Sequence, residues 1–439
     1  MESLKMLESI QLIALLIFII TISFVIWGKV DRTIVALIGV ILMVVTGVMD
    51  EVHAFQFVDW NVIAILIGIW IIAGYFAKTG IPEYLAIKAF KISKRDLAIF
   101  VTLLGIISGF VSMFVDNVVV ILMFAPMIFH ITNKLNLDPF PCIIFVGLCA
   151  NFMGTALLLG DLPPQMLHSV TGIEFLGFVW FQNKPSSFPI LTLTFIPTIL
   201  FFYTSKFKKA FTKISIESLG DSYIRDKRFA IINISIFIGT IVAMSLREFL
   251  GVKLGFIAIA GAVTLILVLE FLKERNLVDC PNFDDVLSSL DWKAIFFYAS
   301  LFSLVGGLEH VGILEMLAEA LKQYFTSTFL GVSILYWVTT PIVGVVEHDA
   351  YILTFLYIIK DLAKFGIDPW PYWWALVWSG TLGSNLTMAG APALYVAMRV
   401  YEKNTGRKAS LREFFSYTVP FTIISSLICY LLLILVWVF

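Results

Sequence analysis

Charged residues are scarce in this chain of 439 residues, at 14% of the total, against about 25% in an average soluble protein. Basic residues are not in excess either, because the formal net charge is −1, so nothing indicates nucleic-acid binding. The four cysteines show neither the spacing of a disulfide framework nor that of a metal site, and we interpret them as small buried hydrophobic residues. What the chain has instead is apolar sequence.

Hydrophobic residues make up 60% of the chain, and apolar runs of about 20 residues recur from end to end. Runs of this length predict helices that cross a bilayer, because a helix satisfies its own backbone hydrogen bonds there. The expected fold class is an all-α polytopic membrane protein. The predicted spans are residues 9–27, 33–49, 59–78, 141–165, 188–204, 229–247, 254–272, 291–310, 371–398 and 414–438.

Two further apolar stretches, residues 97–132 and 326–360, are broken by Gly or Pro and carry an acidic residue near the middle. Each could be a pair of full spans or a re-entrant helical hairpin. Both arrangements return the chain to the side from which it came, so the count of membrane crossings does not depend on the choice.

Residues 57–89 recur in changed form at 289–321. With a constant shift of 232 positions, nine of the 33 aligned pairs are identical. Such a duplication in an apolar chain is typical of transporters whose substrate site lies between two related halves. The clearest matches are Asp59-Trp60 with Asp291-Trp292 and Gly80-Ile81 with Gly312-Ile313.

The basic residues between the spans predict the orientation. All the Lys and Arg clusters face the cytoplasm if the N-terminus is outside and the linker 205–228 is inside. Each half then has five spans, an odd number, so the second half is expected to be inverted relative to the first. The predicted organisation in the cell membrane is a first repeat (1–204), a basic cytoplasmic linker (205–228) and a second repeat (229–439), with hairpins at about 97–132 and 326–360 and broken helices at about 141–165 and 371–398.

The middle of each predicted hairpin holds ionisable residues. Asp116-Asn117 in the first stretch aligns with His348-Asp349 in the second, which follow Glu347. Ionisable groups at membrane depth usually face a cavity or a transport pathway. A carboxylate beside an amide could bind a cation such as sodium, near Asp116, Asn117 and Asp349, or carry a proton, and an imidazole titrates near neutral pH. The alternative for the second group is a water-exposed turn between two full spans.

Glycine-rich breaks interrupt the spans 141–165 and 371–398 at corresponding places. A broken helix presents free N–H groups and carbonyls to a ligand, and matching breaks in two halves are a good indicator of a transport site. The alternative is close helix packing through small residues. No Arg or Lys is evident at membrane depth, which disfavours a multiply charged anion. The candidate site residues in the breaks are Asn151, Gly154, Thr155, Gly160, Asp161, Ser384, Asn385 and Thr387.

Together these motifs resemble those of the ion transporter superfamily, in particular the branch of arsenite permeases, NhaD-type sodium/proton antiporters and melanosomal P-proteins. The resemblance covers most of the chain from about residue 33. It implies two inverted repeats, each with a re-entrant hairpin and a broken helix, which meet at an ion or anion site in mid-membrane. It also implies secondary active transport, often by a homodimer. The residues that carry it are Asp59-Trp60, Asp116-Asn117, Asn151 to Asp161, His168-Ser169 and Gly383-Ser384-Asn385.

The chain departs from the family pattern where Leu157, Gln165 and Leu386 replace smaller or more polar residues and where Glu347-His348-Asp349 forms the second hairpin motif. Neutral ligands are lost and a titratable group is gained, which favours H+ over Na+ as the coupling ion. The predicted function is a secondary active transporter of a small inorganic ion or small anion, proton-coupled by antiport through alternating access. A sodium-coupled carboxylate or oxyanion transporter and a passive ion channel remain alternatives.

An intramembrane enzyme is disfavoured. Asp161 follows Leu-Leu-Gly and therefore lacks the first glycine of the Gly-x-Gly-Asp motif of presenilin-type proteases, and no His-Glu-x-x-His zinc motif occurs. We expect no cofactor and no nucleic-acid partner. The expected partners are the transported ion or small molecule, the lipid bilayer and a second copy of the chain.

Overall fold

The computed structural model describes residues 2–439 except 95, 209–223, 225 and 326, so most of the predicted linker 205–228 lies outside the described residues. The described chain is helical apart from two paired two-residue strands, β1 and β2. The elements of the first half are α1 (Glu2–Trp27), α2 (Arg32–Val45), α3 (Glu51–Gln56), α4 (Trp60–Ala77), α5 (Ile81–Ile92), α6 (Leu97–Ser112), α7 (Asn117–Lys134), α8 (Phe140–Gly154), α9 (Leu162–Thr171), η1 (Phe175–Phe178), β1 (Trp180–Phe181), β2 (Lys184–Pro185), α10 (Ser187–Phe202) and η2 (Tyr203–Phe207).

The second half repeats this order of helices. Each helix from α3 to α9 has a counterpart that begins 230–232 positions later in the chain. The counterparts, in the same order, are the helices α15 to α21. The elements are α12 (Lys227–Ser245), α13 (Arg247–Leu250), α14 (Leu254–Glu274), α15 (Phe283–Leu287), α16 (Trp292–His310), α17 (Ile313–Leu321), η3 (Lys322–Phe325), α18 (Thr328–Ile342), α19 (His348–Leu362), η4 (Ala363–Phe365), α20 (Trp370–Ser384), α21 (Pro392–Thr405), α22 (Leu411–Leu433) and η5 (Ile434–Val438).

Among the described residues, seven helices are long and apolar enough to cross a membrane, and eight if the bent pair Trp292–His310 and Ile313–Phe325 counts as one span. The chain is therefore a multi-pass helical membrane protein. The predicted span 33–49 is the shorter helix α2, whereas 141–165 and 371–398 are each two helices separated by a break, as predicted. The breaks coincide with the glycine-rich segments, because those residues stabilise a helix poorly.

The repeated motifs have local structural causes. Asp59 Oδ1 accepts the N–H groups of Asn61 and Val62 at 2.9 and 3.1 Å, and Asp291 Oδ1 accepts the N–H of Ala294 at 3.0 Å. Both aspartates thus cap the helix that follows, since an acidic N-cap satisfies donors that the helix leaves free. Gly80 and Gly312, in the turns before α5 and α17, have φ values of 79° and 77°, a left-handed conformation that favours glycine.

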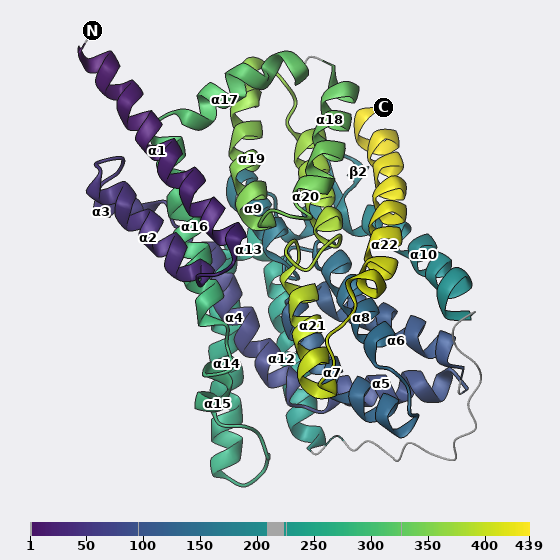
Figure 1. Cartoon of the computed structure of the whole chain (residues 1–439). Coiled ribbons are helices and arrows are strands. Elements are labelled where there is room, and N and C mark those ends of the chain that lie inside the picture. The colour runs from purple at the N-terminus through teal and green to yellow at the C-terminus, as the bar shows by residue number, and fades with distance from the viewer. Residues whose placement is uncertain (1, 95, 209–223, 225, 326) are drawn as a thin grey trace.

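The helices form two groups (Figure 1). A flanking layer of α1, α2, α4, α12, α14 and α16 lies beside an inner bundle of α6 to α10 and α18 to α22. Within the flanking layer α4 packs tightly on α14. The absence of a side chain at Gly68 permits this, since a Cβ there would lie 2.5 Å from the backbone of Ala258. In the bundle, the pair α6–α7 lies in the lower part of the view and α18–α19 in the upper part. The turns that join each pair both reach the same central cavity.

Candidate functional site

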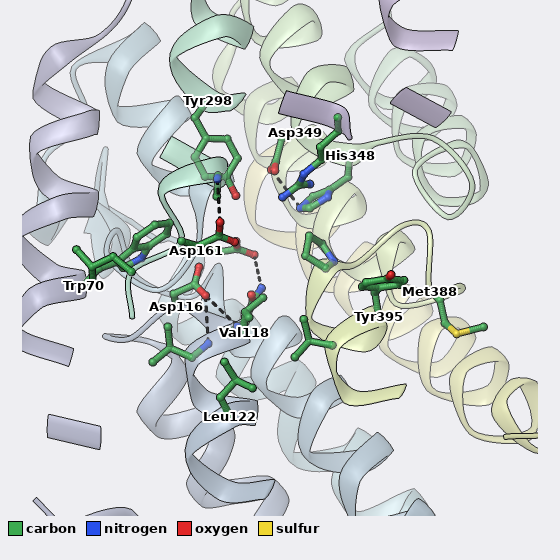
Figure 2. A pocket seen from close by; sticks show the side chains of 18 of the residues that line it. Trp70, Asp116, Val118, Leu122, Asp161, Tyr298, His348, Asp349, Met388 and Tyr395 are labelled. Atoms are coloured by element: carbon green, nitrogen blue, oxygen red, sulfur yellow. Dashed lines mark hydrogen bonds and ion pairs between the residues drawn. The ribbon is translucent and has the colours of Figure 1, made fainter. Parts of the chain in front are cut away.

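A cavity of about 1000 Å³ lies between the flanking layer and the inner bundle. The bundle contributes the turns of both helix pairs and the breaks α8–α9 and α20–α21, and the flanking layer contributes the start of α2, the end of α4 and the start of α16. Figure 2 shows Asp116 and Asp161 of the first half facing His348 and Asp349 of the second. The cavity is therefore built by both halves together.

A network of buried amides joins the two helix breaks to the first turn. Asn117 Nδ2 donates to Asn151 Oδ1 at 3.0 Å and to Asp161 Oδ2 at 3.2 Å. Asn151 Nδ2 in turn lies within bonding distance of Ser384 Oγ (3.0 Å) and Asn385 Oδ1 (3.2 Å). All five side chains are at most 7% exposed. Because buried polar groups are costly when unpaired, this network holds α7, α8 and α20 in one arrangement.

The acidic residues at the two turns also cap helices. Asp116 Oδ1 accepts the N–H groups of Val118 and Val119 at 2.9 and 3.3 Å, and Glu347 Oε2 accepts the N–H of Ala350 at 2.8 Å. Each turn thus places a carboxylate at the N-terminus of the returning helix, α7 or α19, and within the cavity lining. Both halves therefore cap the returning helix with a carboxylate, which is Asp116 in the first half and Glu347 in the second.

The second turn holds three buried ionisable side chains. Glu347, His348 and Asp349 are 8%, 2% and 1% exposed, so the alternative prediction of a water-exposed turn is wrong. One ligand atom from each lies within 4.8 Å of the others, and His348 Nε2 lies 3.2 Å from Asp349 Oδ1. Burial of this many ionisable groups is unfavourable unless a partner or ligand compensates.

Arg32 is the site residue that the sequence did not reveal. From the sequence it counts only among the basic residues that are predicted to face the cytoplasm, yet Arg32 lines the cavity. Its Nη1 lies 3.5 Å from Glu347 Oε1, and its guanidinium lies 4.7 Å from the ring centroid of Phe297. Arg32 is the first residue of α2 and precedes the repeated segment, so no repeat signal marked it. Only the packing of α2 against α16 brings it to the cavity.

The predicted site residues separate into three groups. Five line the cavity, four lie behind it in polar contacts, and three pack the breaks against the turns. The lining residues are Asp116, Asn117, Asp161, His348 and Asp349; the polar contacts involve Asn151, Thr155, Ser384 and Asn385; the packing residues are Gly154, Gly160 and Thr387.

Glycines hold each break against the neighbouring turn in the same way in both halves. A Cβ at Gly160 would lie 2.0 Å from Ser112 O and 2.6 Å from Gly154 O. A Cβ at Gly390 would lie 2.6 Å from both Val343 O and Ser384 O. The close approach of backbone to backbone leaves no room for a side chain, which explains both glycines.

We predict that Gly160→Ala abolishes transport and lowers the melting temperature, because the new methyl group must push the first turn away from the α8–α9 break. Thermal unfolding and flux of the purified protein in liposomes measure the two effects. The matched control is Gly239→Ala in α12, where a Cβ would meet nothing within 4 Å and helix propensity favours alanine. Normal flux in the Gly160 variant would contradict the proposed packing role.

The chain is similar to known membrane transporters. The family model described as citrate transporter matches residues 22–379. An uncharacterized transporter of Mycobacterium tuberculosis is 27% identical over 92% of this chain and 93% of its own length. The P protein of Homo sapiens is 23% identical over 93% of this chain and 58% of its own length. The solved structure of Neisseria gonorrhoeae MtrF, which is described as one of a class of antimetabolite efflux pumps, is similar in fold, with a TM-score of 0.54 and 13% identity over 91% of this chain and 85% of that one.

Proposed function

We propose that this chain, which belongs to the citrate transporter family and is a secondary transporter and not an enzyme, exchanges protons for a small ion. In this proposal the ion and the protons bind alternately to the carboxylates of the central cavity. The two halves form inverted repeats that give the cavity access to each side of the membrane alternately.

The observation that carries the proposal is the acidic lining of the cavity. Its acidic residues, among those described, are Asp31, Glu83, Asp116, Asp161, Asp291, Glu347 and Asp349, and its basic residues are Arg32 and Lys78. An excess of carboxylates inside a membrane protein is stable only when protons or cations compensate their charge. A cation and protons that compete for the same carboxylates exchange with one another, which is antiport.

The position of the cavity along α4 supports alternating access. Lys78, just beyond the last residue of α4, lines the cavity, whereas Asp59 and Asn61 lie at the other end of this helix of 18 residues, about 27 Å away. At that far end the flanking layer is joined to the inner bundle: Ser169 donates to Asp59, and Asn61 Nδ2 lies 3.2 Å from His168 Nε2. With the predicted orientation, the cavity opens toward the cytoplasm and the other end is closed.

The opposite placement of the helix pairs supports inversion. Figure 1 shows α6–α7 and α18–α19 approaching the centre from opposite ends of the bundle, as expected if one half is turned over relative to the other. The predicted five spans in each half, an odd number, also lead to a second half that is inverted relative to the first.

A second candidate is uptake of a small carboxylate together with protons. Arg32 at the cavity and the description of the family as citrate transporters favour it. The N-terminus of α21, which no side chain caps, presents the positive end of the helix dipole to an anion. An anion would enter this acidic cavity only with protons on the carboxylates, so it would move in the same direction as the protons.

Flux measurements in liposomes distinguish these candidates. Under antiport, adding the transported cation outside drives protons out of vesicles that contain a pH-sensitive dye. Under symport, an inward proton gradient accumulates citrate. A passive channel never moves its ion against a gradient. The proposal of proton coupling fails if Na+, K+ or citrate moves through the protein without any effect of an imposed pH gradient.

We further predict that the contacts at the far end of α4 hold the protein in its present state. The double variant His168→Ala/Ser169→Ala should shift the population toward the opposite state. A cysteine placed at Ala77, which lines the cavity, should then react more slowly with an impermeant thiol reagent from the cytoplasmic side. The native cysteines are all buried, so background labelling is low.

The matched control is Thr171→Ala, because the Thr171 hydroxyl makes only local bonds among the contacts described: it donates to Leu167 O and accepts the N–H of Ile173. Labelling should be unchanged in this variant. Equal labelling of the cysteine in the double variant and in the parent would show that the contacts do not act as a closure.

A further inference from the structure

We propose that Arg32 is an internal cation, which holds the inner bundle against the flanking layer until a transported cation or a proton replaces it on Glu347. The inference rests on the proposed exchange of protons for a small cation. It assigns to Arg32 the coupling of ion binding to movement of the bundle, because an empty cavity would then stay closed on its second side.

Arg32 is anchored in the flanking layer by the residues on either side of it. Lys293 Nζ, in α16, lies 2.7 Å from Asp31 Oδ2, and Thr33 Oγ1 donates to Lys293 O at 2.9 Å. The guanidinium itself lies 4.7 Å from the ring centroid of Phe297, one turn further along α16. Arg32 therefore stays with the flanking layer when the inner bundle moves.

Glu347, in contrast, is fixed to the inner bundle. Its Oε2 accepts the N–H of Ala350 at 2.8 Å and so caps α19, while its Oε1 lies 3.5 Å from Arg32 Nη1. The ion pair thus joins the two groups of helices. The Arg32 side chain is 31% exposed, and a partly exposed pair of this length is weak enough for another cation to take the place of Arg32.

The two groups of helices are joined by ion pairs at both ends of α16. In its last turn, far from the cavity, Glu309 Oε1 lies 3.0 Å from Lys360 Nζ of α19. At the cavity, Arg32–Glu347 is the ion pair that joins the layers among the described residues, since Lys78, the other basic residue of the lining, is exposed and has no ion pair among them. The pair of Arg32 and Glu347 is therefore the one that an ion in the cavity can reach.

Charge explains why the empty bundle would not move. Glu347 is only 8% exposed, and moving it away from Arg32 would leave a buried carboxylate without a compensating charge. A proton neutralises this carboxylate and a bound cation compensates it, so the bundle can then separate from Arg32. Binding of an ion or a proton thus becomes the condition for movement, as antiport requires.

A cysteine at Ala389 reports whether the empty cavity reaches the closed side. Ala389 lines the cavity from the α20–α21 break and is exposed, whereas the native cysteines are buried. The full chain is placed in sealed vesicles with N-methylglucamine as the salt cation, and an impermeant thiol reagent is added on the side from which the parent reacts slowly. We expect Arg32→Gln and Glu347→Gln each to raise the labelling rate about fivefold, the shift expected when a partly exposed ion pair is lost.

The variant that combines Arg32→Gln with Glu347→Gln should label no faster than either single variant, because both changes remove the same ion pair. A residue that only stabilised the fold would lower the melting temperature without this non-additive effect on labelling. The matched control is Arg399→Gln, which removes an Arg–Glu pair within α21, 3.8 Å from Glu402, and should label like the parent.

The variant His168→Ala/Ser169→Ala, with the same cysteine, separates failure of this inference from failure of the proposed function. If it labels faster from the closed side while Arg32→Gln labels like the parent, the role of Arg32 is overturned and alternating access stands. If neither variant labels faster, alternating access fails and the role of Arg32 fails with it. Additive effects of Arg32→Gln and Glu347→Gln would also overturn the inference, because the two residues would then act separately.

Discussion

Asp116→Asn and Asp349→Asn are each expected to abolish proton-coupled flux while the protein remains folded. Both carboxylates line the cavity, with Asp349 buried and Asp116 partly buried, and an amide of the same shape cannot take up and release a proton. Asparagine caps a helix as well as aspartate does, so α7 should keep its start and the stability cost should be small. Dye-based flux in liposomes and thermal unfolding measure the two properties separately.

Asp96→Asn is the matched control for Asp116→Asn. Asp96 caps α6 through the N–H of Ile99 at 3.1 Å, in the same way that Asp116 caps α7, but it does not line the cavity. Flux should therefore be normal in this variant. If the double variant Asp116→Asn/Asp349→Asn retained both flux and its response to a pH gradient, proton coupling through these carboxylates would be disproved.

Asn151→Leu is expected to destabilise the protein strongly and to stop transport. Asn151 is wholly buried, and its amide connects Asn117 of the first turn to Ser384 and Asn385 of the second break. Leucine fills a similar volume but leaves the amide oxygen of Asn385 without the partner that Asn151 supplies. Each buried polar group left unpaired costs about 1–3 kcal/mol. The melting temperature and the flux in liposomes should fall together.

Asn233→Leu is the matched control for Asn151→Leu, because it removes one buried amide that lies outside the network of Asn117, Asn151 and Asn385. Asn233 is also wholly buried, but its amide makes a single weak bond, to Ile72 O at 3.4 Å, between α12 and α4. We expect a smaller drop in melting temperature and normal flux. If the two variants behaved alike, the connection between the halves would not be what transport requires.

Several features of the fold were predictable because they depend on short stretches of sequence. Apolar runs predicted the membrane class, and the 232-residue shift predicted which helices would correspond. Gly-rich segments predicted the breaks between α8 and α9 and between α20 and α21. The repeated Asp59 and Asp291 each cap the helix that follows, which is a local effect because an N-cap acts on the next three residues only.

The site itself was predictable in part. Asp116, Asp161 and Asp349 reach the cavity as expected, because an ionisable group inside a membrane protein has few other places to go. Thr387 was expected to bind substrate, but its hydroxyl bonds to Gly344 O and ties the second break to the second turn. A threonine beside glycines suits either role, and its neighbours in sequence do not distinguish them.

By itself the sequence determined the kind of protein, the order of its helices and the residues that could carry charge into the membrane, since hydropathy and capping act over a few neighbouring residues. Only the tertiary structure decided which of those residues meet. Arg32 comes to face Glu347 across 315 positions of sequence because α2 packs on α16, and Asn151 joins Asn117 to Ser384 because α7, α8 and α20 converge. Such contacts depend on how whole helices pack, and no short stretch of sequence contains that information.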